Sequence, residues 1–263
     1  MALVGTKSEN HLMKTPGGNE HGEAPTGLGF SGADGPLIAV AGLCGGAGAS
    51  LFSYLLAVAS ARESHGRVLL CDLGGPAATI STYAQLESDF SIPQASRYIA
   101  AKSRPPGRPF VEAANGLRLI CRAPEPAGAT PIGGVMKILS DAKRAHALTV
   151  LDCGGLQRSV EYACLSIATN VVWVLPATIV GLQRARALLD TLEVGPGCRE
   201  ILLARTDRGA RKAPLPSLAD LADSRQAPLL LMESVEDPLE APIEDLIGQT
   251  ALTLQALAGA VLR

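Results

Sequence analysis

Charged residues are scarce in this chain: they make up 18% of its 263 residues, and the formal net charge is −2. Proteins that grip nucleic-acid phosphates usually carry a basic patch, but here Lys and Arg are scattered, apart from the stretches around 104–108 and 205–212. The sequence therefore gives no strong indication of a nucleic-acid partner. The apolar fraction of 47% instead predicts a compact, well-buried domain.

Cysteine pairs with CxxC spacing are also absent. Most of the six cysteines lie in apolar runs that resemble strands, which predicts buried free thiols in a reducing compartment rather than a metal site or a redox pair. The six are Cys44, Cys71, Cys121, Cys153, Cys164 and Cys198.

No segment has the pattern of a membrane span. The start of the sequence lacks the regions of a signal peptide, so we expect none, and the longest uncharged stretch, 162–183, is interrupted by Asn170 and Pro176. The last predicted helix, 242–263, has Arg263 as its only basic residue, which favours packing over lying on a membrane surface. We expect a cytoplasmic protein without direct membrane insertion, which a partner could recruit to a membrane or pole.

The order of the predicted elements indicates the fold class. Residues 1–35 are rich in Gly and polar residues and predict a disordered tail, whereas in residues 36–263 strands alternate with helices, as in an α/β domain. We expect a three-layer fold with a mostly parallel central sheet flanked by helices. The predicted strands are 36–43, 66–73, 116–123, 147–154, 170–177, 199–206 and 227–234; the predicted helices are 50–63, one short helix within 86–102, 130–145, 159–168, 179–193, 217–224 and 242–263.

A glycine-rich loop joins the first strand to the first helix. Its sequence is LCGGAGAS (43–50), and glycines there let backbone N–H groups approach an anion at the helix N-terminus. Ser50 stands where a hydroxyl would bind Mg²⁺, but Ala49 replaces the lysine of the strict phosphate-loop pattern GxxxxGK[ST]. A tight turn without a ligand therefore remains an alternative.

Three segments in this order resemble the ParA/MinD family of P-loop ATPases. They are GLCGGAGAS, VLLCDLGGPAATIS and TVLDCGGLQRSVEYACLSIATNVVWVLPATIVGLQRARALLD, and the resemblance extends over about residues 36–262. The family's loop reads KGGxGK[ST], so Cys44 stands at the lysine that reaches the partner subunit's nucleotide, and Ala49 at the phosphate lysine. The resemblance implies that ATP or ADP binds through Gly45, Gly46, Ala47, Gly48, Ala49, Ser50 and Leu51.

The resemblance also assigns roles to three carboxylates. Asp72 matches the first switch motif and is a weak catalytic candidate, since the acidic residue that orients water two positions later is Gly74 here. Asp152 matches the second switch aspartate and would hold Mg²⁺ together with Ser50, and Asp207 is the candidate for reading the adenine. Capping of a loop or helix N-terminus is the alternative role for Asp72, Asp152 and Ser50.

A loop that lacks both lysines but retains GGAGAS is most similar to the loop of the CpaE/TadZ branch and its septum-site-determining-like relatives. This implies a degenerate nucleotide-binding localisation or assembly factor for a secretion, Tad pilus or septum-site system, with little or no hydrolysis, protein partners and an optional homodimer. The first alternative is an active ATPase in which Arg184, Arg186 or Arg205 supplies the missing charge. The second is an interaction scaffold that binds no nucleotide and retains only the fold.

Overall fold

The computed structural model describes residues 34–63, 67–73, 79–86, 88, 90–103, 107, 110–113, 116–121, 130–206, 212–235, 239 and 241–261. All but the last two residues of the predicted tail lie outside these ranges. The strands are β1 (Leu37–Gly42), β2 (Val68–Asp72), β3 (Val111–Glu112), β4 (Leu117–Ile120), β5 (Leu148–Asp152), β6 (Asn170–Pro176), β7 (Arg199–Thr206) and β8 (Leu229–Glu233). The helices are α1 (Ala49–Glu63), α2 (Thr79–Ala84), α3 (Ile92–Ala100), α4 (Ile132–Ala145), α5 (Ser159–Leu165), α6 (Ile179–Leu189), α7 (Leu215–Ser224) and α8 (Ile243–Val261).

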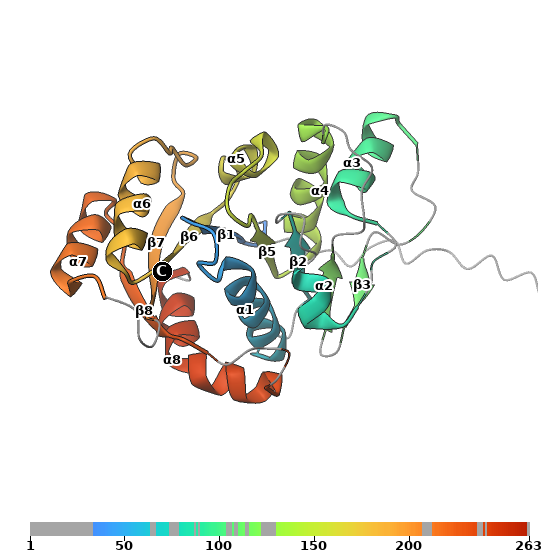
Figure 1. Cartoon of the computed structure of the whole chain (residues 1–263). Coiled ribbons are helices and arrows are strands. Elements are labelled where there is room, and N and C mark those ends of the chain that lie inside the picture. Colours follow the sequence, from blue (N-terminus) through green and yellow to red (C-terminus); the bar gives the residue numbers. More distant parts are fainter. Residues whose placement is uncertain are drawn as a thin grey trace, which may run out of the picture. The chain divides into compact units, whose positions relative to one another are not determined.

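The strands form one sheet in the order β3-β4-β2-β5-β1-β6-β7-β8 (Figure 1). Every neighbouring pair is parallel except β3 with β4, so the predicted mostly parallel sheet is confirmed. From β1 the chain passes to β2, β3 and β4 on one side, returns to β5 beside β1, and then continues to β6, β7 and β8 on the other side. The connections therefore change direction at the carboxyl ends of β1 and β5. Ligands of open α/β sheets bind at such a position.

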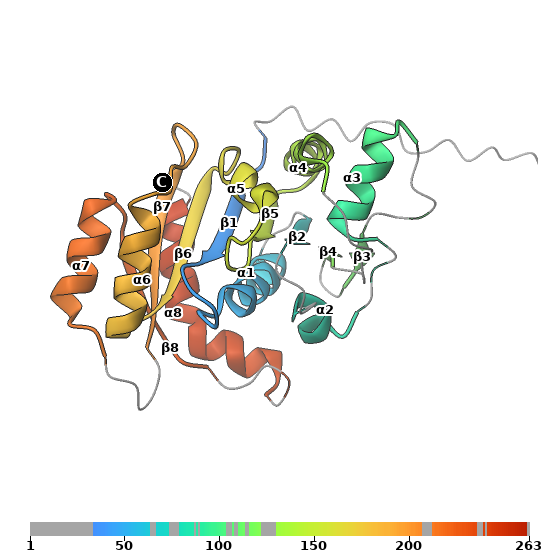
Figure 2. The ribbon, with the colours of Figure 1, turned by 45° about the horizontal axis from the view of Figure 1, so that its top comes forward.

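Both faces of the sheet are buried. In β1 every residue is buried, and alternate residues enter different apolar clusters: Leu37 and Ala39 face one side, and Ile38 and Val40 face the other. The first cluster includes side chains of α3 to α7, and the second includes side chains of α1, α2 and α8. Figures 1 and 2 show these two helical layers on either side of the sheet, which confirms the predicted three-layer arrangement.

Two short elements are not predicted by the sequence. The six residues of α2 bury only Ile80, and β3 has two residues, so neither is long enough to show a periodic pattern. The helix predicted at 217–224 begins earlier, at Leu215, because Pro216 occupies the first turn, where a missing N–H group costs nothing. Within the described parts of the chain, no helix is both long enough and apolar enough to cross a bilayer.

The cysteines follow the prediction in the main. All six are free thiols; Cys71, Cys121, Cys153 and Cys164 are buried, whereas Cys44 and Cys198 are partly buried. Burial raises the pKa of the buried thiols, to about 11 for Cys121 and about 12 for Cys164. The buried thiols are therefore protonated near neutral pH, as expected of packing residues.

Candidate phosphate-binding site

The glycine-rich loop is fixed to the carboxyl edge of the sheet at its base. The N–H of Gly42 donates to the Gly154 carbonyl (2.7 Å), beyond the end of β5, and the N–H of Leu43 donates to the Val174 carbonyl (2.8 Å) in β6. The N–H of Phe52 then donates to the Gly48 carbonyl (2.9 Å) and begins the hydrogen-bond ladder of α1. The loop is thus held by both neighbours of β1 before it enters the helix.

The conformation of the loop depends on glycine at two positions. Gly46 has φ +73° and Gly48 has φ +93°, a region that L side chains rarely adopt. Around Gly45 and Gly46 a side chain would meet open space, and both residues are exposed. The N–H groups of residues 45, 46 and 48–50 donate to no backbone carbonyl among the described residues. With the N-terminus of α1 behind them, these donors form a site suited to an anion.

Position 49, where the phosphate lysine stands in the resembling family, has no charge. Ala49 is only 6% exposed, and its methyl group belongs to the apolar cluster of Val40 and Phe52. At position 44, burial raises the pKa of the Cys44 thiol, while the charges of Arg184 and Arg205 act in the opposite direction. The loop therefore has no charge of its own, but two guanidinium groups lie within electrostatic range.

Arg205 reaches this loop directly. It is the penultimate residue of β7, which is separated from β1 only by β6. Its Nη2 donates to the Gly46 carbonyl at 3.0 Å, and a Cβ built on Gly48 would lie 2.5 Å from its Nη1. Arg186, another of the three arginines that the sequence offers as a source of the missing charge, instead donates to the Ser217 carbonyl of α7 at 3.3 Å.

Asp152 and Ser50 lie together beneath the loop. Asp152 ends β5, has no exposed surface, and accepts a hydrogen bond from the Gly154 N–H at 3.0 Å through Oδ1. Its Oδ2 has no hydrogen-bond partner among the described residues. Burial raises the pKa of this carboxyl to about 6, and the interactions with Ser50 and the Gly154 N–H oppose the shift. A buried carboxylate with an unused oxygen beside a hydroxyl is unexplained by packing alone.

These two side chains suit a magnesium ion. Mg²⁺ is usually bound by one or two protein oxygens, with the remaining positions taken by water and substrate phosphates. No group of three or more His, Cys, Asp or Glu in the described part of the chain could hold a metal by itself. Ser50 and Asp152 therefore fit a Mg²⁺ that arrives with a phosphate ligand, and not a metal site made only of protein groups.

The loops that follow β2 and β5 meet at the same edge. Asp72 ends β2, is 4% exposed and lies opposite Asp152 in the strand register. Arg158 connects the two loops: its Nε contacts Glu161 Oε1 at 2.7 Å, and its Nη2 donates to the Leu73 carbonyl. Sequence patterns alone do not single out Arg158 or Glu161, although an acidic residue three positions after the start of a helical segment is a capping signal.

The predicted site residues thus converge, with two qualifications. Residues 45–50, Asp72 and Asp152 all lie at the carboxyl edge of the sheet. The side chain of Leu51 is buried with Leu55 and Leu246, so only its backbone could serve a ligand. Asp207 lies outside the described residues.

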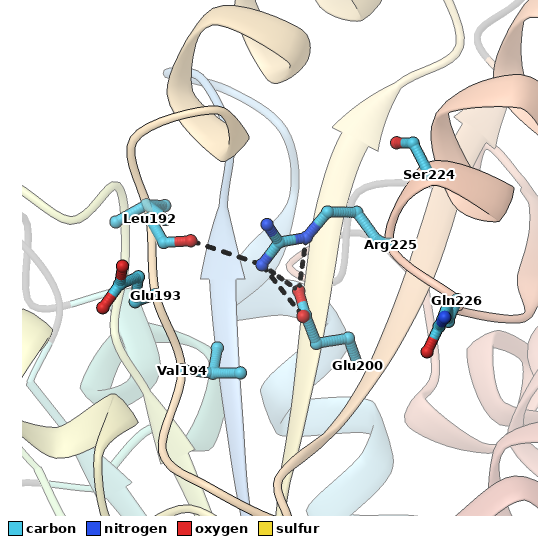
Figure 3. Close-up of a pocket in the computed structure, with 7 residues that line it drawn as sticks. All are labelled: Leu192, Glu193, Val194, Glu200, Ser224, Arg225 and Gln226. Carbon is cyan, nitrogen blue, oxygen red and sulfur yellow. Dashed lines mark hydrogen bonds and ion pairs between the residues drawn. The ribbon is translucent and has the colours of Figure 1, made fainter.

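A separate hollow of about 400 Å³ lies at the opposite end of β7 (Figure 3). In it, the Arg225 guanidinium contacts Glu200 through Nε (3.0 Å) and Nη2 (2.8 Å) and donates to the Leu192 carbonyl (3.3 Å). Glu200 also accepts a hydrogen bond from Trp173 Nε1 at 2.6 Å. Glu200 and Arg225 hold one another, which is typical of a structural ion pair.

Comparison with solved structures finds the same fold in a ParA family ATPase, in McdA and in MinD. A complex of Cyanothece McdA with ATP is 16% identical, with a TM-score of 0.61, and the match covers 86% of this chain and 98% of that one. A ParA family ATPase from Chlorobium tepidum is 16% identical, with a TM-score of 0.59, and the match covers 82% of this chain and 92% of that one. MinD of Pyrococcus horikoshii with Mg-ADP is 15% identical, with a TM-score of 0.58, and the match covers 86% of this chain and 98% of that one. No protein-family model and no curated protein matches the sequence. At these identities the likeness establishes the fold.

Proposed function

We propose that this protein binds ATP or ADP with Mg²⁺ at the loop 45–51 and hydrolyses ATP slowly or not at all. The observation that carries the proposal is the unused, fully buried Oδ2 of Asp152 beside Ser50, directly under a loop of available N–H donors. Any helix start offers N–H donors, but a turn that only connects β1 to α1 would not need a buried carboxylate with an unused oxygen beside it. The solved McdA and MinD structures with ATP and Mg-ADP support a nucleotide as the ligand.

Each part of the site has a role in this proposal. The N–H groups of residues 45, 46 and 48–50 would donate to phosphate oxygens, and the α1 dipole would favour their negative charge. Ser50 and Asp152 would hold Mg²⁺, directly or through water, and the ion would neutralise charge on the phosphates. Asp207, outside the described residues, remains the proposed contact to the adenine.

Weak hydrolysis follows from the two missing lysines. Neither Cys44 nor Ala49 can place a positive charge on the phosphate that is transferred. Electrostatic stabilisation of that group is the main catalytic contribution in phosphoryl transfer, and losing one charged contact costs roughly 2–4 kcal/mol of barrier. We therefore expect binding to survive better than turnover, and Asp72 to contribute little to catalysis.

The proposed cellular role is positioning or assembly. Residues 36–263 would act as one nucleotide-dependent domain that serves a secretion, Tad pilus or septum-site system, as in the CpaE/TadZ branch. Protein partners, and optionally a second copy of the chain, would read the nucleotide state. Any recruitment from the cytoplasm to a membrane or pole would come from such a partner.

The test is a calorimetric titration of the full chain with ATP and with ADP, each with Mg²⁺ and with EDTA. We expect micromolar binding that Mg²⁺ strengthens. Gly48→Val should abolish the binding, because residue 48 has a positive φ that valine rarely adopts and because a Cβ there would meet Arg205. The matched control is Gly248→Val on α8, where a Cβ meets nothing within 4 Å. A folded wild-type protein that gives no heat with millimolar nucleotide would contradict the proposal and favour the scaffold alternative.

An active ATPase is the second candidate, and the position of Arg205 favours it. A guanidinium on the loop could act where the lysines are absent. Fast, sustained phosphate release by the wild type, lost in Arg205→Gln, would support this candidate. Slow or absent release would support the first proposal.

A further inference from the structure

The phosphate loop lacks a lysine but does not lack a cation. Arg205 comes from β7, at a position far from the loop in sequence, and its guanidinium lies against the loop between Gly46 and Gly48. We infer that Arg205 is the phosphate-gripping charge of this site, supplied by the same chain from a different strand in place of the lysine. This inference rests on the proposed nucleotide binding.

The backbone around Arg205 places the side chain at this edge. The Arg205 carbonyl accepts a hydrogen bond from the Ala177 N–H at 2.7 Å, and the residue pairs with Pro176 in the register of β6 and β7. β6 itself holds the base of the loop through Val174. The backbone of Arg205 and the base of the loop are therefore both held by β6. The sheet thus fixes where the Arg205 side chain begins relative to the loop.

The chemistry of arginine suits the task. A guanidinium stays charged at any physiological pH and carries five N–H donors in a planar fork, which matches two phosphate oxygens at once. Its Nη2 holds the Gly46 carbonyl, and so the shape of the loop, and its positive charge lies where it would attract a phosphate. A lysine at position 49 would grip the phosphate from the start of α1, whereas Arg205 does so from the side of β6 and β7.

Two further features agree with this role. Gly48 has no side chain where Nη1 of Arg205 lies, since a Cβ would approach it to 2.5 Å, so the glycine makes room for the guanidinium as well as for positive φ. Burial raises the pKa of the Cys44 thiol, whereas the charges of Arg184 and, to a smaller extent, Arg205 act to lower it, so both guanidinium groups lie within electrostatic range of the loop. Of the two, only Arg205 donates a hydrogen bond to the loop among the described residues.

The experiment compares Arg205→Gln, Arg205→Lys and the wild type by calorimetry with Mg-ATP and Mg-ADP, at low and at moderate salt. Arg199→Gln is the matched control: the same substitution on the same strand, at its exposed opposite end. Removing a charge-assisted contact should weaken ATP binding by about 10- to 100-fold. Arg205→Lys should recover part of the affinity, and Arg199→Gln should bind as the wild type does.

Salt dependence separates a phosphate contact from a structural role. The wild type should lose more affinity than Arg205→Gln when salt is raised, because only the wild type keeps the screened interaction. Thermal unfolding of each variant checks that Arg205→Gln is folded, as its partly exposed position leads us to expect.

The outcomes are distinguishable. If the wild type binds ATP and Arg205→Gln binds equally well with the same salt dependence, this inference is overturned while the proposed function stands. If Arg205→Gln binds more tightly, the guanidinium obstructs the loop and the inference is again overturned. If the folded wild type binds no nucleotide, the proposed function fails and this inference fails with it.

Discussion

Replacing Asp152 by Asn should stabilise the protein at neutral pH in the absence of nucleotide. The carboxyl is fully buried at the end of β5, and burial raises its pKa to about 6 in the folded state. In the unfolded chain an aspartate has a pKa of about 3.9. The folded state thus binds the proton more tightly, so this group destabilises the fold progressively as pH rises from about 4 to about 6.

The magnitude follows from the difference between the two pKa values. About two pH units at 1.36 kcal/mol each give about 3 kcal/mol at pH 7 and above. Asparagine keeps the oxygen that accepts from the Gly154 N–H and carries no charge to desolvate. We expect Asp152→Asn to raise the free energy of unfolding by up to about 3 kcal/mol at pH 7.5 and by less than about 1 kcal/mol at pH 4.5.

Urea unfolding at both pH values, with EDTA and without nucleotide, measures this difference. The exposed Asp190 at the C-terminal end of α6 gives the control, since Asp190→Asn should change stability by less than about 0.5 kcal/mol. The reasoning is refuted if Asp152→Asn is less stable than the wild type at pH 7.5, or if its advantage is the same at both pH values. A stabilised variant that no longer responds to Mg²⁺ in the nucleotide titration would show that the carboxylate is kept for binding, at a cost in stability.

Two other predictions concern the packing. Glu200→Ala should lower the free energy of unfolding by about 2–3 kcal/mol, because it leaves the largely buried Arg225 guanidinium without its carboxylate partner. It should also shift the fluorescence of Trp173, the chain's single tryptophan, by removing its hydrogen bond, and unchanged fluorescence would contradict that contact. Gly134→Ala should destabilise the protein by about 1–3 kcal/mol, because a Cβ there lies 2.5 Å from a backbone oxygen of α3. Gly133→Ala, one residue earlier and facing open space, should stabilise the protein by about 0.5 kcal/mol. Urea unfolding that ranks the two variants the other way would contradict this packing.

Apolar runs predict the central strands well, because strands buried on both faces need a continuous apolar sequence. β1, β5, β6 and β7 occur within two residues of their predicted bounds. The glycine-rich turn between β1 and α1 is also predictable, since a cluster of glycines between a buried strand and a segment of helical spacing is typical of a strand–helix connection. The elements that escape prediction, α2 and β3, are too short to repeat any pattern.

The position of Arg205 could not be predicted in the same way. The sequence offers Arg184, Arg186 and Arg205 on equal terms, and only the sheet order β1-β6-β7 shows that Arg205 can donate to the loop. The buried state of Asp152 is likewise a property of three dimensions, because it depends on what covers the end of β5. The local sequence identifies the charged groups, but the order of the strands determines which of them lie close together.

The packing of α8 on α1 has a consequence for biosynthesis. Figure 1 shows α8 beside α1. Leu51 and Leu55 of α1, the helix that follows the glycine-rich loop, are buried with Leu246 of α8, and Arg62 contacts Glu244 across the same boundary at 2.6 Å. The ribosome makes α1 before α2 to α7, and α8 after them. The helix behind the loop therefore stays partly uncovered until α8 has been made. A nascent chain would thus complete the packing around α1 only after α8 has left the exit tunnel.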